Sequence, residues 1–160
     1  MSARIIDGKA AAARLTDDVG AAVAARVAGG RSRPGLAVVL VGENAASQVY
    51  VRNKRRTTEA AGMGSFAYDL PGETPEADLL ALIDALNADP VVHGILVQLP
   101  LPKHIDEERV TERIDPGKDV DGFPPYNIGR LVLKRPTLRP CTPYVCMRLL
   151  AGTGEDLVGK

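Results

Sequence analysis

Residues 34–42 read PGLAVVLVG, and this stretch decides the fold class of the chain. Its apolar part, residues 36–41, is short, continuous and rich in valine, and turn-forming residues bound it on both sides. Such a run is typical of a strand that is buried on both faces of a parallel sheet. Because neighbouring parallel strands need a crossover connection, the flanking sequence should alternate between helices and strands.

The sequence after this strand shows that alternation. Residues 47–61 have a helical composition and precede Gly62, a residue that can take positive φ at the end of a helix. Residues 64–70 and 94–98 are two further strand candidates.

A second crossover helix should lie between those two strands. Thr74 is a good N-cap, and Pro75 suits the first helical position. Apolar residues then recur at helical spacing up to residue 87: Leu79, Leu80, Ile83 and Leu86. We therefore predict an α/β fold, a three-layer α-β-α arrangement with a mostly parallel sheet built from βαβ units.

The N-terminal segment predicts an amphipathic helix before the first strand. Asp7 is a suitable N-cap, and Gly29 and Gly30 end the helical pattern. Four apolar residues recur every four positions within it: Leu15, Val19, Val23 and Val27.

The C-terminal part of the chain has a different texture. Residues 99–129 are rich in proline and read mostly as loop, with one short helix near residues 106–114. A last helix should span residues 143–150, capped by Thr142 and ended by Gly152. The Gly-Lys ending after that helix is expected just before a new strand, so we expect this chain to be the first part of a longer one.

The composition narrows the class of protein. The 20 Lys and Arg residues balance 20 Asp and Glu residues, which disfavours nucleic acid as the default partner. The two cysteines, Cys141 and Cys146, lack CxxC spacing, so no metal ion is implied and a reducing compartment is favoured. Because no apolar run is long enough to span a bilayer, we expect a cytoplasmic protein without membrane contacts.

Ligands of open α/β sheets bind beyond the carboxyl ends of the strands, where two groups of polar residues are expected. After the first strand, Ser47, Tyr50 and Lys54 fall three and four positions apart and share one helix face. Lys54 lies among Arg52, Arg55 and Arg56, and neighbouring cations disfavour its charged form, so its amine could move protons. The alternative interpretation is a solvated basic face.

Two other polar residues follow apolar segments. Gln98 ends the third strand, where its amide could bind a ligand or satisfy backbone groups. Asp121 lies in a loop rich in Gly and Pro, residues 118–125, and its carboxylate could accept paired N–H groups or cap a turn. His93 and His104 are isolated, and we assign neither of them a role.

Four segments together resemble successive motifs of the bifunctional methylenetetrahydrofolate dehydrogenase/cyclohydrolase family. They are VGENAASQVYVRNKRRTTEAAGM at 41–63, GILVQLPLP at 94–102, KDVDGFPPYNIGRL at 118–131 and PCTP at 140–143. The resemblance implies oxidation of 5,10-methylenetetrahydrofolate with NADP, and hydrolysis of the methenyl product to 10-formyltetrahydrofolate. It also implies a homodimer for the full-length enzyme.

The resemblance also implies roles for individual residues. Lys54 matches the catalytic lysine, Gln98 the glutamine that positions it, Tyr50 the tyrosine beside the substrate rings, and Asp121 the pterin anchor. The remaining implied substrate contacts are Ser47, Val97, Leu99 and Pro100. The methenyl intermediate is a cation, so a lysine that can lose its proton suits attack by water, whereas a permanent charge would repel the substrate.

The resemblance divides the chain and leaves one element missing. Residues 1–139 would form the folate-binding catalytic domain, and residues 140–160 an interdomain helix and linker. No GxGxxG dinucleotide motif leads from a strand into a helix, so the NADP site is expected outside this sequence. Val145 stands where the family usually has glycine.

Two alternatives to this reading stay open. The chain could be a folate-binding module without catalysis, or a nucleic-acid binder that uses Arg52, Lys54, Arg55 and Arg56. The zero net charge and the few aromatic residues argue against nucleic-acid binding.

Overall fold

The computed structural model describes residues 5–156 and 158–159, and within them the chain forms a three-stranded parallel sheet. The strands are β1 (Gly35–Val41), β2 (Gly64–Leu70) and β3 (Gly94–Val97), in the order β2-β1-β3. β1 is central and pairs with both neighbours, Val39 standing opposite Tyr68 and Val97. The predicted strands are therefore confirmed, with β3 ending one residue earlier than expected.

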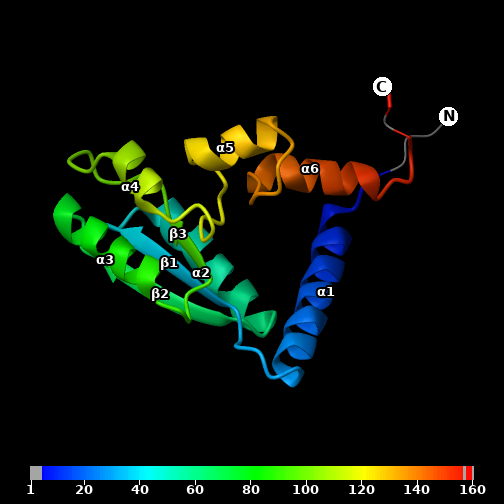
Figure 1. Ribbon diagram of the computed structural model, residues 1–160, viewed down its shortest axis with the longest axis horizontal. Helices are drawn as coiled ribbons and strands as arrows, with labels where there is room; N and C mark the ends of the chain where they lie inside the picture. Colours follow the sequence, from blue (N-terminus) through cyan, green and yellow to red (C-terminus); the bar gives the residue numbers. More distant parts are fainter. Residues whose placement is uncertain (1–4, 157, 160) are drawn as a thin grey trace.

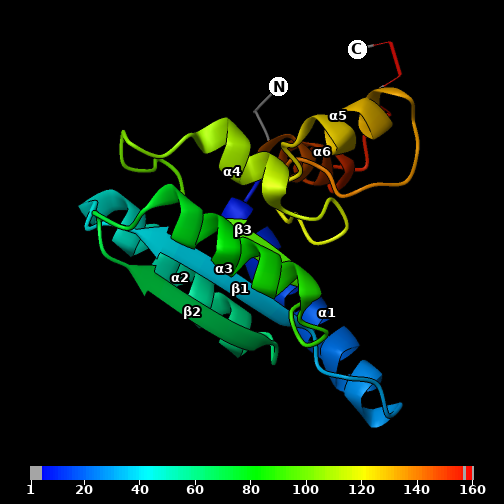
Figure 2. The ribbon, with the colours of Figure 1, turned by 60° about the vertical axis from the view of Figure 1, so that its left-hand side comes forward.

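Helices cover both faces of this sheet (Figures 1 and 2). α2 (Ala45–Ala60) packs on one face, where Val51 meets Val38 and Leu40 of β1. α3 (Glu76–Ala88) and α4 (Glu107–Arg113) cover the other face. The apolar side chains of that larger core include Ala37, Val39, Val41, Leu79, Ile83, Leu86, Ile95, Val97 and Val110. The predicted three-layer α-β-α fold is confirmed.

The predicted N-terminal helix is present as α1 (Gly8–Ala28), with Asp7 accepting a hydrogen bond from the N–H of Ala10 as its N-cap. Most of its apolar stripe is not covered, because Leu15 and Val27 are exposed and only Val23 is buried. Figure 1 shows this helix extending away from the sheet. α1 therefore offers apolar side chains to the surface.

The C-terminal segment contains two helices, α5 (Pro125–Val132) and α6 (Cys141–Ala151), which lie beside each other beyond the sheet in both views. The prediction that residues 99–129 are mostly loop was wrong for α5. Proline is compatible with the first turn of a helix, since the missing N–H would have no partner there, and Pro125 occupies such a position.

Two predicted helix caps were also wrong. Pro75 is the N-cap of α3, and the Thr74 hydroxyl instead donates to the carbonyl oxygen of Pro71 at 2.7 Å. α6 begins at Cys141 with Pro140 as its N-cap, so Thr142 lies inside the first turn. In both places the proline sets an extended backbone immediately before the helix, and this displaces the boundary by one or two residues.

No helix among the described residues is both long and apolar enough to cross a membrane. The described residues likewise contain no group of three or more His, Cys, Asp or Glu side chains placed to hold a metal ion.

Candidate active site

Lys54 and Gln98 meet at the carboxyl edge of the sheet. The Lys54 ammonium donates a hydrogen bond to Oε1 of Gln98 at 2.9 Å. The Gln98 amide is itself held, because its Nε2 donates to the carbonyl oxygen of Leu99 at 2.6 Å and its main-chain N–H donates to Val39 at 2.9 Å. The side-chain oxygen of Gln98 is thus turned toward Lys54, and a neutral group holds the amine.

The sequence of α2 explains why Lys54 lies at this edge. Asn44 is the N-cap, and its side chain accepts a hydrogen bond from the N–H of Ser47. Ser47 and Val51 are buried against the sheet, whereas the Tyr50 side chain one turn before Lys54 is 63 % exposed. The helix therefore presents a flat aromatic ring and an amine to the same open region.

Arg55 fixes the other side of α2. Its guanidinium donates two hydrogen bonds to the carboxylate of Asp69 on β2, at 3.0 and 2.6 Å. This ion pair lowers the pKa of Asp69, chiefly through the hydrogen bonds from Arg55. Arg55 therefore links α2 to β2 through Asp69, whereas the neighbouring Lys54 contacts Gln98.

Asp121 faces the same region from the loop after β3. Partial burial raises the pKa of its carboxyl group, the charge of Lys54 lowers it, and the charge of Asp119 raises it further. Because Lys54 acts on this carboxyl group electrostatically, the two side chains belong to one cluster. The structure thus brings together Lys54, Gln98 and Asp121.

Cys141 is a fourth member of the cluster that the sequence reasoning missed. Its thiol donates to the carbonyl oxygen of Val120 at 3.3 Å, and burial followed by the charge of Asp121 raises the pKa of the thiol. The PCTP motif drew attention to this segment, but nothing in the spacing placed the thiol beside Asp121. The first residue of α6 therefore closes one side of the site.

The remaining predicted substrate contacts differ in accessibility. Leu99 and Pro100, joined by a cis peptide bond, are exposed next to Gln98. Val97 is 4 % exposed and packs in the core, and Ser47 is also buried. Leu99 and Pro100 can touch a ligand with their side chains, whereas Val97 can offer little more than its main chain.

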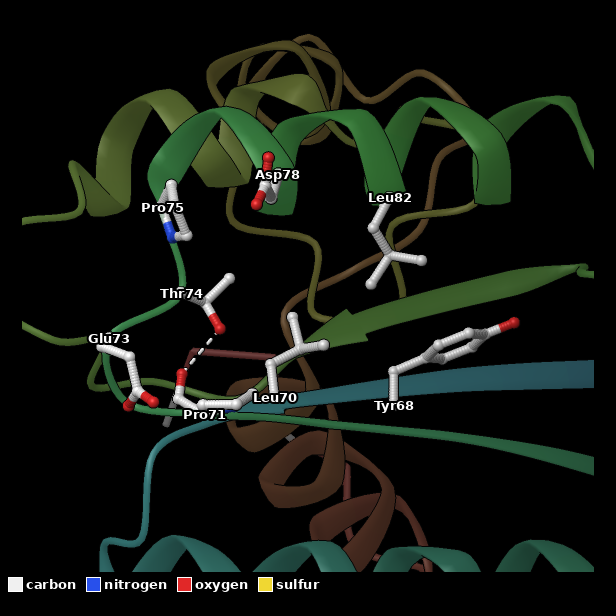
Figure 3. A pocket seen from close by; sticks show the side chains of 8 residues that line it. All are labelled: Tyr68, Leu70, Pro71, Glu73, Thr74, Pro75, Asp78 and Leu82. Carbon is white, nitrogen blue, oxygen red and sulfur yellow. Dashed lines mark hydrogen bonds between the residues drawn. The ribbon is translucent and has the colours of Figure 1, made fainter.

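Two hollows of the chain are lined by residues outside this cluster. One, of about 450 Å³, lies between the end of β2 and the first turn of α3, with Tyr68, Leu70 and Leu82 on its apolar wall (Figure 3). The other, of about 920 Å³, lies between α2 and the end of β2, near Arg52 and Arg55. Lys54, Gln98 and Asp121 line neither of these two hollows, and all three are half-buried.

The turn from β1 into α2 does not fit the phosphates of a dinucleotide. The turn from β1 into α2 is Gly42-Glu43-Asn44, with a single glycine and an exposed acidic side chain next to the helix N-terminus. A pyrophosphate bound at such a terminus needs close backbone approach and no opposing negative charge. We therefore assign no dinucleotide contact to this turn.

Comparisons with known proteins agree with the sequence motifs. Residues 6–121 match the family described as tetrahydrofolate dehydrogenase/cyclohydrolase, catalytic domain. A relative from Hydrogenovibrio crunogenus, bifunctional protein FolD 1, is 57% identical over 159 residues, which are 99% of this chain and 56% of that protein. The chain thus spans about half the length of the curated relative that it matches.

Solved structures show the same partial coverage. A FolD methylenetetrahydrofolate dehydrogenase/cyclohydrolase from Campylobacter jejuni is 43% identical, with a TM-score of 0.92 over 96% of this chain and 55% of its own. A methylenetetrahydrofolate dehydrogenase-cyclohydrolase from Trypanosoma brucei, complexed with NADP cofactor and inhibitor, is 36% identical, with a TM-score of 0.92 over 100% of this chain and 55% of its own.

Proposed function

The chain belongs to the tetrahydrofolate dehydrogenase/cyclohydrolase family, and from this premise we propose that it supplies the folate-binding and proton-transfer site of such an enzyme. The proposed reactions are the NADP-dependent oxidation of 5,10-methylenetetrahydrofolate and the hydrolysis of 5,10-methenyltetrahydrofolate to 10-formyltetrahydrofolate. The observation that carries the proposal is the Lys54–Gln98 hydrogen bond of 2.9 Å in a cluster with Asp121.

The hydrolytic step suits these side chains. Water adds to the cationic bridging carbon of the methenyl group, and Lys54 accepts the proton that the water loses. The bond from that carbon to N5 then breaks as N5 takes up a proton, and the added hydroxyl group loses its remaining proton to become the carbonyl of the formyl group on N10. Gln98 orients the Lys54 amine through the hydrogen bond to its Oε1 without adding a charge beside the cationic substrate.

Folate binding would use the other members of the cluster. The Asp121 carboxylate can accept two hydrogen bonds from the amino-pyrimidine edge of the pterin. Tyr50 offers an exposed ring for the aromatic part of the substrate, with Leu99 and Pro100 beside it. We include the Ser47 and Val97 backbones as supports of this surface.

The oxidation requires hydride transfer to the nicotinamide cofactor. Because no GxGxxG motif leads from a strand into a helix in this sequence, we assign to this chain only the contacts and proton transfers on the folate side. Residues 1–139 are proposed as the folate-binding domain, and residues 140–160 as an interdomain helix and linker.

We also propose a homodimeric, cytoplasmic enzyme. Exposed apolar residues on α6, among them Tyr144, Val145 and Met147, support association of this helix with another surface. The free cysteines Cys141 and Cys146 are compatible with a reducing compartment. Light scattering that gives the mass of one chain would contradict self-association of this chain.

The test of the proposed function is the absorbance decay of 5,10-methenyltetrahydrofolate without dinucleotide. We compare the chain, its Lys54→Ala variant and a matched Lys103→Ala control, in which the exposed lysine that is removed does not belong to the cluster. We expect the chain and the Lys103→Ala control to accelerate decay above buffer, and Lys54→Ala to lose at least about 100-fold of that acceleration. Folate binding without acceleration by any variant would instead select the non-catalytic folate-binding module.

A further inference from the structure

A buried polar network lies beneath the loop that carries Asp121. Asp119 and Asn127 are 2 % and 1 % exposed. Nδ2 of Asn127 donates both to Oδ2 of Asp119 and to the carbonyl oxygen of Pro116, each at 3.0 Å. The hydroxyl of Thr137 donates to Oδ1 of Asn127. Asn127 thus holds the Asp119 carboxylate, and Pro116 and Thr137 in turn hold Asn127.

The other oxygen of this carboxylate holds Asp121. Oδ1 of Asp119 accepts a hydrogen bond from the main-chain N–H of Asp121 at 3.1 Å. Asp119 itself is fixed against β3, because Ile95 and Asp119 form a parallel bridge in which the Ile95 N–H donates to Lys118 at 2.7 Å. The position of Asp121 is therefore fixed relative to the sheet by this side chain and by the main chain before it, where the Val120 N–H donates to the carbonyl oxygen of Ile95 at 3.4 Å.

The loop is also closed from the opposite side. Gly122 has a φ of 69°, and a Cβ atom at this position would lie 2.6 Å from the carbonyl carbon of Arg139 and 2.7 Å from the nitrogen of Pro140. The residue after Asp121 is thus packed against the segment that leads into α6. With Asp119 below and Arg139–Pro140 above, the Asp121 main chain has little freedom.

The buried Asp119 carboxylate lowers the stability of the fold unless its hydrogen bonds compensate for its desolvation. Burying a charge carries a desolvation penalty that apolar packing would avoid. Here both carboxylate oxygens are used, one by Asn127 and one by the main chain of Asp121. An apolar side chain could fill the space but could not fix the direction of the Asp121 N–H.

We propose that Asp119, held by Asn127 and Thr137, is a positioning residue that sets the place and the charge of Asp121 for recognition of the amino-pyrimidine edge of folate. This inference rests on the proposed function, in which Asp121 is the pterin anchor. Asp119 touches no substrate and acts through Asp121. It differs from a purely structural residue in that its loss changes which ligands bind.

The charge of Asp119 gives the proposal a pH signature. The pKa of the Asp121 carboxyl group is raised by burial, lowered by the charge of Lys54 on α2 and raised by the charge of Asp119 in the same loop. The Cys141 thiol at the start of α6 lies beside this carboxyl group. Folate binding should weaken as the pH falls through the raised pKa of Asp121. Removing the Asp119 charge lowers that pKa, so the acid limb should move to lower pH.

The first experiment measures the affinity of the chain for 5-formyltetrahydrofolate by titration calorimetry, for the wild type and Asp119→Asn. A second ligand is the analogue in which a methyl group replaces the 2-amino group, because it retains the ring N–H but loses one of the two hydrogen bonds to Asp121. We expect Asp119→Asn to bind 5-formyltetrahydrofolate at least tenfold more weakly than the wild type does, and the analogue to lose affinity by a clearly smaller factor. An equal loss for both ligands, or an unmoved acid limb, would overturn the inference.

A milder pair of variants covers the case in which Asp119→Asn does not fold. Thr137→Val removes only the hydroxyl that donates to Asn127, and Thr137→Ser retains it. We expect Thr137→Val to weaken binding of 5-formyltetrahydrofolate threefold or more and Thr137→Ser to stay within twofold of the wild type. Binding that is the same in both variants would contradict the network.

The outcome separates this inference from the proposed function. The proposed function stands and the inference fails if the wild type binds 5-formyltetrahydrofolate, Asp121→Ala does not bind it, and Asp119→Asn binds it as tightly as the wild type does. If the wild type binds neither ligand, both are overturned together.

Discussion

Replacing Gln98 by glutamate tests the proposal that Lys54 works as a proton acceptor. The substitution keeps the size of the side chain and places a carboxylate where Oε1 now accepts from the Lys54 ammonium at 2.9 Å. A negative charge at this distance stabilises the protonated lysine. If hydrolysis requires the free amine, Gln98→Glu should be slow even though the contact is retained.

The size of the effect follows from the exposure of the pair. Two unit charges about 4 Å apart attract by roughly 1 kcal/mol in water and about 4 kcal/mol at an effective dielectric constant near 20. Lys54 and Gln98 are both partly exposed, which favours a value between these limits. About 2 kcal/mol corresponds to a ~30-fold smaller population of free amine.

The assay is the initial rate of 5,10-methenyltetrahydrofolate decay at pH 7, corrected for decay in buffer. Gln98→Glu should be ~30-fold slower than the wild type, because the added carboxylate holds the proton on the Lys54 amine. Gln98→Met, neutral and similar in length, is the control, and it should be slow through loss of orientation alone. A Gln98→Glu rate equal to that of the wild type would refute the role of Lys54 as proton acceptor.

Three further predictions concern stability. Burial raises the pKa of Asp121, so the ionised carboxylate destabilises the folded chain at neutral pH. Asp121→Asn should therefore have a higher free energy of unfolding in urea at pH 7 than the wild type, and this difference should disappear as the pH falls below about 4. The same variant should bind folate more weakly. Arg55 lowers the pKa of Asp69, which is 58% exposed on its side chain; Asp69→Asn should lose about 0.2–1 kcal/mol at pH 7, and the difference should disappear as the pH falls through that lowered pKa. Leu79 is fully buried, and Leu79→Ala should cost about 2–5 kcal/mol by chemical denaturation, a smaller loss indicating that the core collapses around the site.

The sheet could be predicted because its strands are continuous apolar runs between turn residues. Residues 64–70 match β2 at both ends, and residues 36–41 fall within β1. α5 was not predicted, because the proline-rich sequence of residues 99–129 favours a loop, although Pro125 suits the first turn of a helix. Arg130 donates to the carbonyl oxygen of Pro136 at 3.0 and 2.8 Å, and Asn127 binds Asp119. Such tertiary contacts leave no local pattern in the sequence.

Part of the candidate site could likewise be predicted from the sequence, and part could not. Lys54 and Gln98 follow two neighbouring strands, and the carboxyl ends of parallel strands meet at one edge, so their proximity is expected from the sequence. Asp119 reads as an ordinary turn residue beside Asp121. Only the fold brings Asn127, eight residues farther along, to its buried carboxylate, and Thr137, 18 residues farther along, to Asn127.

The two halves of the site therefore rest on different kinds of support. Lys54 and Gln98 are placed by the backbone hydrogen bonds and apolar packing of the sheet, which many residues share. Asp121 is held by the buried carboxylate of Asp119 and by the close contacts around Gly122, so a few specific atoms determine its position. Because removing one partner of a buried polar pair costs far more than trimming an apolar contact by one methyl group, substitutions around α5 should harm folate recognition first. Variants that still hydrolyse a bound methenyl group slowly but discriminate poorly among folates are the expected result of damage on this side of the site.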